Sequence, residues 1–418
     1  RPPGTREGAK KAVTATVALL VLIPMQSFEA STHARCWLYS IARLAEMREG
    51  LRQATVEKYI AAQEYHAAQG AQRATLAPKE AVPSVEEEKL LRTHYEWQGV
   101  FNVCKQLNEL EETSCTHRAA FTALMYFKRF FLKVSSLEED PTHVMLAALF
   151  LAGKVEEEKI EMDDLLRLYA PKLKPESLLA LELRLLEVLQ FQLVIFSPYR
   201  SLFGFLQDLH DSAPRTEGAT LQLQQLQEGG VQLIGRLLCS DVLLLHSPQQ
   251  VALAVVRHVA RQHGGGKAAV DVEAWIKARF ASQEGGHADA DGGGGGVLQQ
   301  LAAVEEQIVA TTALHARLDG DEAQGRLKAI EQRRRLSSRI VRAYMGEKEQ
   351  ERRAAEQKEL AAQKHVRRAA QERRVEASGT APSAPVAGAG ADTVTLSKRK
   401  RADEMSRADD KAVVVVVE

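Results

Sequence analysis

The sequence predicts an all-α protein built from two tandem five-helix units, with flanking N- and C-terminal helices. Period-two alternation of apolar and polar residues is nearly absent, whereas apolar residues recur at helical spacing along most of the chain. There is also an internal repeat. Asp140-Pro141 and Ser247-Pro248 each precede an apolar segment, and the two prolines lie 107 residues apart, counted from Pro141 to Pro248. Each copy predicts a capped, buried helix at the centre of its unit.

The composition limits the class of protein and of site. The chain has 418 residues, room for two or three domains, and its 55 basic residues balance its 55 acidic residues. Because its formal net charge is zero, the chain as a whole is not attracted electrostatically to nucleic acid or to a membrane surface, and we expect neither as a direct partner. The cysteines lack CxxC pairs and ligand spacing with histidines, which argues against zinc and a disulfide framework. We therefore expect no metal and no cofactor. The cysteines are Cys36, Cys104, Cys115 and Cys239.

Residues 1–24 have the outline of a secretory signal peptide, because basic residues precede an apolar run from Ala12 to Ile23. The rest of the chain does not support secretion, since its cysteines are not paired and its tail is basic. Met25 opens a stretch that reads like a natural start. We therefore expect residues 1–24 to be an upstream extension of a gene model; a real targeting segment is the alternative.

Residues 25–83 form the expected N-terminal helical segment. The stretch 31–69 predicts one long amphipathic helix or a pair of helices, and Pro78 and Pro83 end the segment. The apolar face is expected to consist of Trp37, Leu38, Ile41, Leu44, Met47 and Leu51.

Residues 84–193 form the first five-helix unit. Ser84 and Glu87 predict a capping box for a helix that continues to Leu107, and Thr113 or Ser114 is expected to cap the next helix. Asp140-Pro141 then starts the central helix, with a side-chain acceptor at the cap and proline at the first helical position. Because the run 144–152 has no polar residue, this helix should be buried on all sides.

Glu182 is the unusual residue of this unit. It lies in a helix predicted from Pro175 to about Gln190, and the neighbours on its helix face are leucines. A carboxylate among leucines is costly unless it is paired, and Lys154 at the end of the central helix is the nearest candidate partner. The alternative is that Glu182 points past the leucines to solvent, while Lys154 merely favours a helix C-terminus.

Residues 194–318 form the second unit, which begins at the helix start Ser197-Pro198. In the repeat, Arg261 falls where Lys154 stands in the first copy. The glycine runs 264–266 and 292–296 read as flexible loops. They lack the GKS/T ending of a phosphate-binding loop and follow no strand, so we reject nucleotide binding.

Residues 319–376 predict a charged C-terminal helical region, and residues 377–418 predict a disordered tail with a basic cluster. The cluster is Lys398, Arg399, Lys400 and Arg401, which has the physical character of a nuclear import signal. The first half of the helical region has an apolar face, expected to consist of Leu327, Ile330, Leu336, Ile340, Val341 and Tyr344.

Several motifs resemble the cyclin family, and within it the cyclin H type. Residues 125–132, Met-Tyr-Phe-Lys-Arg-Phe-Phe-Leu, resemble the second helix of the first cyclin box. Residues 150–157, Phe-Leu-Ala-Gly-Lys-Val-Glu-Glu, resemble its third helix and the exit from it. Residues 189–193, followed by Ser-Pro-Tyr-Arg at 197–200, resemble the bridge into the second box. The resemblance covers about residues 25–318.

The resemblance implies a regulatory subunit without a catalytic centre. Its implied partners are a cyclin-dependent kinase, a RING-type assembly factor, and the general transcription factor IIH complex, which phosphorylates the RNA polymerase II tail; the same trimer would activate other cyclin-dependent kinases. The implied location is the nucleus. Lys154 and Glu182 match the positions at which cyclins pair a lysine with a glutamate against the kinase. The surrounding apolar kinase-binding surface is implied to be Phe150, Leu186, Phe191 and Leu193.

Some features depart from the family or leave other functions open. The substrate-docking patch of cell-cycle cyclins is replaced here by residues 89–94, Lys-Leu-Leu-Arg-Thr-His, which argues against substrate docking. Another transcriptional cyclin, of the C, K, L or T type, is an alternative. A DNA-binding protein of the factor IIB type also uses tandem cyclin folds, but it needs a basic groove and usually a zinc ribbon, and the sequence contains neither signal.

We predict that the cluster from Lys398 to Arg401 directs nuclear import. Replacing its four residues with alanine should reduce nuclear accumulation of a tagged protein, measured by imaging in cells that lack the partner kinase. As a control, alanine at Arg367-Arg368 and Arg373-Arg374 removes the same charge from the helical region. Unchanged accumulation of the first variant would rule out this cluster as the sole import signal.

Overall fold

The computed structural model describes residues 28–70, 77–110, 115–263, 269–280, 297–318 and 320–377. Every regular element in these ranges is a helix, which confirms the all-α prediction. The N-terminal segment 1–24, both glycine runs and the basic cluster Lys398–Arg401 lie outside the described residues.

The N-terminal segment is a pair of helices with short turns at each end. It consists of η1 (Phe28–Ala30), α2 (Thr32–Trp37), α3 (Ile41–Ala68) and α4 (Pro78–Ala81). The side chains of Ser31 and Ser40 accept hydrogen bonds that cap α2 and α3. Trp37 and Leu44 are buried, but the prediction for Ile41 is wrong, because its side chain is exposed. Ser40 starts a new helix there, so the apolar face of α2 does not continue in phase.

The first unit follows as α5 (Val85–His94), the π-helical turn η2 (Tyr95–Val100), α6 (Phe101–Leu107), α7 (His117–Phe130), α8 (Pro141–Val155), α9 (Met162–Tyr169) and α10 (Pro175–Val188). The capping box of Ser84 and Glu87 is present. The predicted cap of the next helix is wrong: Thr116, rather than Thr113 or Ser114, caps α7. Glu158 favours Thr116 as the cap residue, because the Glu158 carboxylate accepts hydrogen bonds from both the backbone N–H and the hydroxyl of Thr116.

Helix α8 is the centre of the first unit. Asp140 caps it by accepting a hydrogen bond of 3.0 Å from the backbone N–H of Thr142. All residues from Val144 to Leu149 are buried, and α7 and α10 pack against the helix. The expectation of a central helix buried on all sides is therefore confirmed over most of its length.

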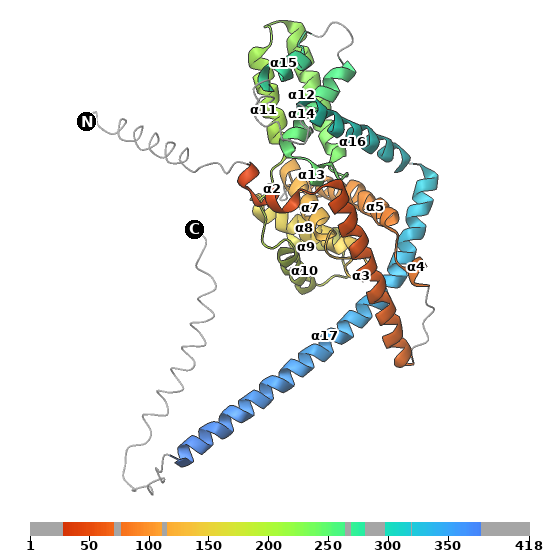
Figure 1. Ribbon diagram of the computed structural model, residues 1–418, viewed down its shortest axis with the longest axis vertical. Coiled ribbons are helices and arrows are strands. Elements are labelled where there is room, and N and C mark those ends of the chain that lie inside the picture. The colour runs from red at the N-terminus through yellow and green to blue at the C-terminus, as the bar shows by residue number, and fades with distance from the viewer. Residues whose placement is uncertain are drawn as a thin grey trace, which may run out of the picture. The chain divides into compact units, whose positions relative to one another are not determined.

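The second unit repeats this plan, as Figure 1 shows in green to teal. It consists of α11 (Pro198–Ser212), α12 (Glu217–Leu237), the short α13 (Val242–Leu245), α14 (Pro248–His263), α15 (Val272–Phe280) and α16 (Val297–Leu318). Helix α14 takes the central place, with α11, α12 and α16 packed around it. The internal repeat therefore corresponds to a repeated structure, and one buried apolar core runs through both units.

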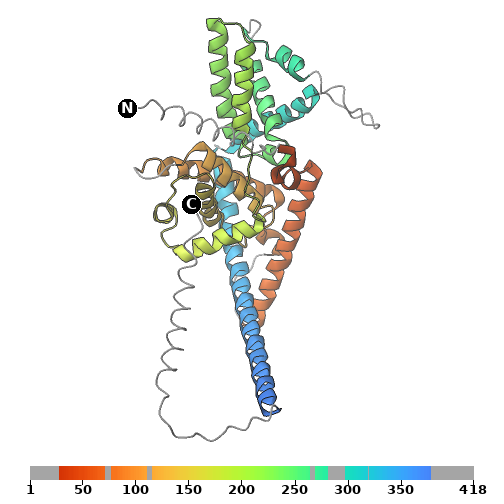
Figure 2. The same cartoon turned by 90° about the vertical axis from the view of Figure 1, so that its left-hand side faces the viewer.

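Helix α17 (Asp321–Ala377) is shared between two compact bodies, one ending at Lys348 and the other beginning at Glu349. In the first body, Leu327 and Ile330 pack on Leu91, while Ile340 and Val341 pack on α3 (Figure 2). The predicted face is thus confirmed at these four residues, but Leu336 is exposed. Arg334 is fully buried beside it, where it binds Glu331 and donates to the carbonyl of Ser136.

The described part of the second body, residues 349–377, is a helix with almost fully exposed side chains. Arg352 pairs with Glu349 and Glu356 at helical spacing. Exposed ion pairs of this kind contribute little to stability. Because its side chains are exposed, this part of the helix does not pack against the rest of the described chain.

His33 is a buried neutral histidine in the N-terminal segment. Its Nδ1 accepts a hydrogen bond of 3.1 Å from the backbone N–H of Phe196, and its ring packs edge-on against Phe28. Burial, followed by the nearby charge of Arg129, lowers the pKa of His33 to about 3. Protonation would place a charge in this apolar contact between the N-terminal segment and the start of the second unit.

We predict that His33 makes the fold acid-sensitive. The unfolded state binds a proton near pH 6.5 and the folded state only near pH 3, so stability from this group falls as pH drops through that window. Between pH 7 and pH 5 the loss should be about 2 kcal/mol. In denaturant titrations, the wild type should therefore lose about 2 kcal/mol more free energy of unfolding between pH 7 and pH 5 than His33→Gln does. Parallel pH curves would contradict the prediction.

Candidate functional site

Lys154 and Glu182 form an ion pair between the last turn of α8 and the middle of α10. The ammonium Nζ of Lys154 lies 2.7 Å and 3.0 Å from the two carboxylate oxygens of Glu182. The Lys154 side chain is 51% exposed, whereas that of Glu182 is 10% exposed. The predicted pairing is therefore confirmed, and the alternative in which Glu182 points to solvent is wrong. The cation of the pair faces water and its carboxylate lies below it.

Phe150 holds the ammonium of Lys154 from another side. The Nζ atom lies 4.1 Å from the centre of the Phe150 ring, within cation–π distance. Phe150 precedes Lys154 by one helical turn of α8, so this contact forms within one helix, whereas the carboxylate of Glu182 comes from α10. The position of the ammonium is thus set by an aromatic face and a carboxylate together.

Apolar side chains lie exposed next to this pair. Leu179 and Leu183 are exposed and Leu186 is half-buried, and their spacing places the three on one face of α10. Phe191, in the segment after the helix, is 65% exposed, Val194 is also exposed, and Leu193 is half-buried. Groups of exposed large apolar residues are typical of interaction sites. We call these six residues, together with Phe150, the apolar rim.

Sequence reasoning identified part of the apolar rim and missed the rest. Phe150, Leu186, Phe191 and Leu193 were expected, whereas Leu179, Leu183 and Val194 were not. The signal for two of them was present, because Leu179, Leu183 and Leu186 follow one another at helical spacing beside Glu182. Since α10 is rich in leucine on several faces, the sequence does not reveal which face remains uncovered.

The backbone that carries Phe191 is in an unusual conformation. Gln190 and Phe191 have φ angles of 54° and 55°, in the left-handed region that residues other than glycine seldom adopt. The backbone N–H of Phe191 donates to the carbonyl of Leu186 at 3.0 Å, and that of Gln190 donates to Glu187 at 2.9 Å. These bonds close the end of α10 and direct Phe191 into solvent. Such backbone strain is found at functional sites more often than elsewhere.

The next residues of this segment are anchored to α7 and to the N-terminal segment. The side chain of Gln192 accepts a hydrogen bond of 2.7 Å from the indole of Trp37, and the Leu193 carbonyl accepts one of 2.8 Å from the Tyr126 hydroxyl. The guanidinium of Arg129 lies 4.7 Å from the centre of the Trp37 ring. Trp37 thus helps to hold the segment that presents the apolar rim, a link that the sequence alone does not predict.

The second unit has a counterpart of the Lys154–Glu182 pair. Arg261, at the repeat position of Lys154, lies 2.9 Å from Glu305 on α16 and 2.6 Å from Glu273 on α15. Arg261 is 51% exposed and Glu305 is 12% exposed, close to the values of the first pair. The repeat therefore preserves an ion pair at this place, but in the second unit the cation has two carboxylate partners.

Within the described ranges, no group of three or more histidine, cysteine or acidic residues is arranged to hold a metal ion. None of the helices there combines the length and the apolar character needed to cross a bilayer. The described chemistry of the site is thus an ion pair with an apolar rim.

We predict that Gln190→Gly stabilises the free protein by about 0.5–1 kcal/mol, because glycine relieves the left-handed strain. Chemical denaturation measures the effect. As a control, Ala180→Gly in the exposed middle of α10 should lower stability by about 1 kcal/mol. Equal losses in both variants would show that the end of α10 is not strained.

Comparison with known proteins identifies the family. The family model of the cyclin N-terminal domain matches residues 87–194, and that of the cyclin C-terminal domain matches residues 197–317. Cyclin-H1-1 of Arabidopsis thaliana is 26% identical over 245 residues, which cover 56% of this chain and 70% of the relative. Cyclin-H of Xenopus laevis is 33% identical over 149 residues, which cover 34% of this chain and 45% of the relative.

A solved structure supports the same fold. A chain in the structure of the CAK complex from Chaetomium thermophilum superposes with a TM-score of 0.57 and 20% identity, covering 74% of this chain and 88% of that chain. At this identity the likeness shows the fold alone. Together, the two family matches extend over more than half of the sequence, and several of the relatives are cyclins H: the chain belongs to the cyclin family and is of the cyclin H type.

Proposed function

We propose that this chain is a cyclin H-type regulatory subunit, which binds and activates a cyclin-dependent kinase that acts in transcription. The observation that carries the proposal is the Lys154–Glu182 pair with its apolar rim, on a chain of the cyclin family. Cyclins are regulatory subunits rather than enzymes, and we infer that this chain likewise acts through binding.

The free donor capacity of Lys154 supports a role in binding. An ammonium group has three N–H donors, and the two oxygens of Glu182 accept two of them. One donor remains for a carbonyl or carboxylate of the partner, on a side chain that is half exposed. The apolar rim would supply the buried area around this contact, and Phe191 would be its most prominent side chain.

Activation would follow from where the cyclin binds. A protein kinase is active only when its regulatory helix lies inward and completes a lysine–glutamate pair at the nucleotide site. A cyclin that binds this inward state more tightly shifts the kinase population toward it. Lys154, Glu182 and the apolar rim are the residues that we assign to this differential binding.

The further partners follow from the cyclin H type. We infer a RING-type assembly factor as the third subunit, membership of general transcription factor IIH, and a nuclear location. Affinity purification followed by mass identification of bound proteins tests this set. Recovery of a kinase that partners cyclins of the C, K, L or T type, without the RING-type factor, would contradict the assignment to the cyclin H type.

We predict that Lys154→Ala and Glu182→Ala each weaken kinase binding by roughly 30-fold to several thousand-fold. Truncation of one partner in a partly desolvated pair typically costs ~2–5 kcal/mol. The double variant should cost clearly less than the sum of the two, because the second change removes a charge that is already unpaired. Titration of kinase affinity for the three variants measures both effects.

Arg261→Ala provides the matched control, since Arg261 has the same exposure and pairs with a glutamate of similar burial in the second unit. It should leave kinase affinity within about threefold of the wild type, as expected for an ordinary surface position. Two silent variants at Lys154 and Glu182, with normal kinase activation, would falsify this face as the kinase-binding site.

A further inference from the structure

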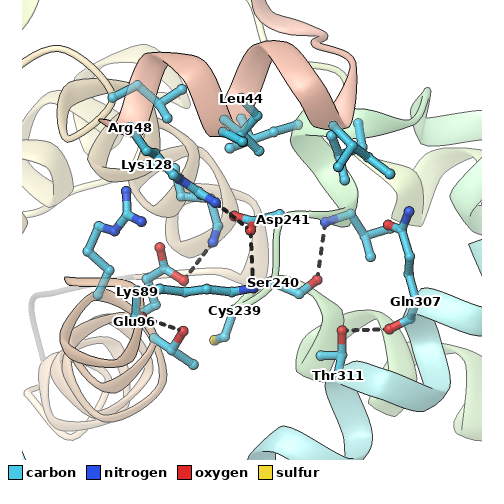
Figure 3. A pocket seen from close by; sticks show the side chains of 18 of the residues that line it. Leu44, Arg48, Lys89, Glu96, Lys128, Cys239, Ser240, Asp241, Gln307 and Thr311 are labelled. Carbon is cyan, nitrogen blue, oxygen red and sulfur yellow. Dashed lines mark hydrogen bonds and ion pairs between the residues drawn. The ribbon is translucent and has the colours of Figure 1, made fainter. Parts of the chain in front are cut away.

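A cavity of about 460 Å³ lies where the N-terminal helix α3 meets both five-helix units. Its wall includes Arg48 of α3, Lys89 of α5, Asp241 before α13 and Thr311 of α16 (Figure 3). This volume is within the range of small-ligand sites in proteins. The cavity is separate from the Lys154–Glu182 pair and from the apolar rim, none of whose residues line it.

Two of the three carboxylates that line the cavity, Asp241 and Glu96, have cationic partners, and the third, Glu86, is exposed. Arg48 binds Asp241 through two hydrogen bonds of 2.5 Å and 2.8 Å, and Lys128 binds Glu96 at 2.6 Å. In Figure 3, dashed lines from Arg48 and Lys89 both reach Asp241. The Lys89 ammonium is farther away, 3.7 Å from an oxygen that Arg48 already engages.

Arg92 is the cation without a partner. It lines the cavity, is only 9% exposed, and makes no hydrogen bond or ion pair with any residue that the structure describes. Burial, followed by the nearby charge of Arg48, lowers the pKa of Arg92, while the carboxylates of Glu88, Asp241 and Glu96 oppose that shift. A guanidinium nevertheless stays charged in proteins. Arg92 therefore lies near carboxylates without a direct hydrogen bond to any of them, and an anion in the cavity would supply that bond.

The lining also indicates what kind of ligand fits. Lys89 and Arg92 are three residues apart on α5 and therefore share one helix face, so two cations are available to a single group. A doubly charged phosphate matches two cations better than a singly charged carboxylate, and the guanidinium fork binds phosphate oxygens in pairs. Apolar side chains complete the wall, and they favour a ligand with an apolar body. They include Leu44, Leu132, Leu244 and Leu245.

We propose that this cavity binds a small phosphate monoester, with its phosphate on Arg92 and Lys89 and its organic part against the leucines. Because α3, α5 and α16 all contribute to the wall, the bound ligand joins the N-terminal helix to both units. The ligand should therefore stabilise the folded chain as well as bind to it.

The test uses the full chain and phenyl phosphate as the probe, with inorganic phosphate in parallel at constant ionic strength. Calorimetric titration should give saturable binding of phenyl phosphate, tighter than that of inorganic phosphate, and thermal unfolding should shift upward with ligand concentration. Arg92→Gln should weaken phenyl phosphate binding by about tenfold or more, as expected for loss of a charge-assisted contact. Arg43→Gln, an exposed arginine of α3 outside the cavity, should leave binding unchanged.

A second variant keeps the test independent of Arg92. Ala310→Phe fills the cavity from α16 without changing a charge and should also abolish binding. Absence of saturable binding to the wild type, or equal binding by the wild type and Arg92→Gln, would overturn the proposal. Inorganic phosphate binding as tightly as phenyl phosphate would overturn the assignment of an esterified ligand. None of these outcomes depends on kinase binding.

Discussion

The middle of helix α8, residues 144–152, has no polar side chain, and this constraint shapes the rest of the first unit. A helix that is apolar all round is stable in water only when other helices cover each side of it. Helices α7 and α10 pack directly against α8, and the next helices close the shell. Helix α14 imposes the same requirement on the second unit, where α11, α12 and α16 surround it. The two-unit architecture is therefore the consequence of burying two helices of this kind in one chain.

Local signals explain which parts of the fold can be predicted from the sequence. Caps act within a few residues, so the starts at Ser84, Asp140 and Ser197 were predictable from Ser, Asp and Pro alone. Where several neighbouring residues could each serve as the cap, the predicted helix start was wrong. Thr113, Ser114 and Thr116 are all plausible caps, and the distant Glu158 decides between them. Ile41 failed because a second cap, at Ser40, reset the helical phase.

The candidate site, too, could be predicted from the sequence only in part. The pairing of Lys154 with Glu182 was predictable as a hypothesis, because a carboxylate among leucines requires a partner. Contacts between segments far apart in the chain were not predictable from local patterns. Trp37 reaches Gln192, Arg48 reaches Asp241, and the backbone N–H of Tyr39 donates to Leu244 at 2.8 Å. These bonds depend on how the N-terminal helices lie across both units, which no single stretch of sequence specifies.

The two ion pairs of the repeat differ in how many carboxylates the cation binds. Arg261 uses Nε and both terminal nitrogens on Glu273 and Glu305, whereas Lys154 has a single carboxylate partner. In the second unit the cation therefore bridges two carboxylates, at the position where the first unit has a one-to-one pair. A duplicated fold would otherwise present two equivalent faces to the same partner. Because the two units carry different ion pairs, a partner that fits the face of one unit does not find the same face on the other.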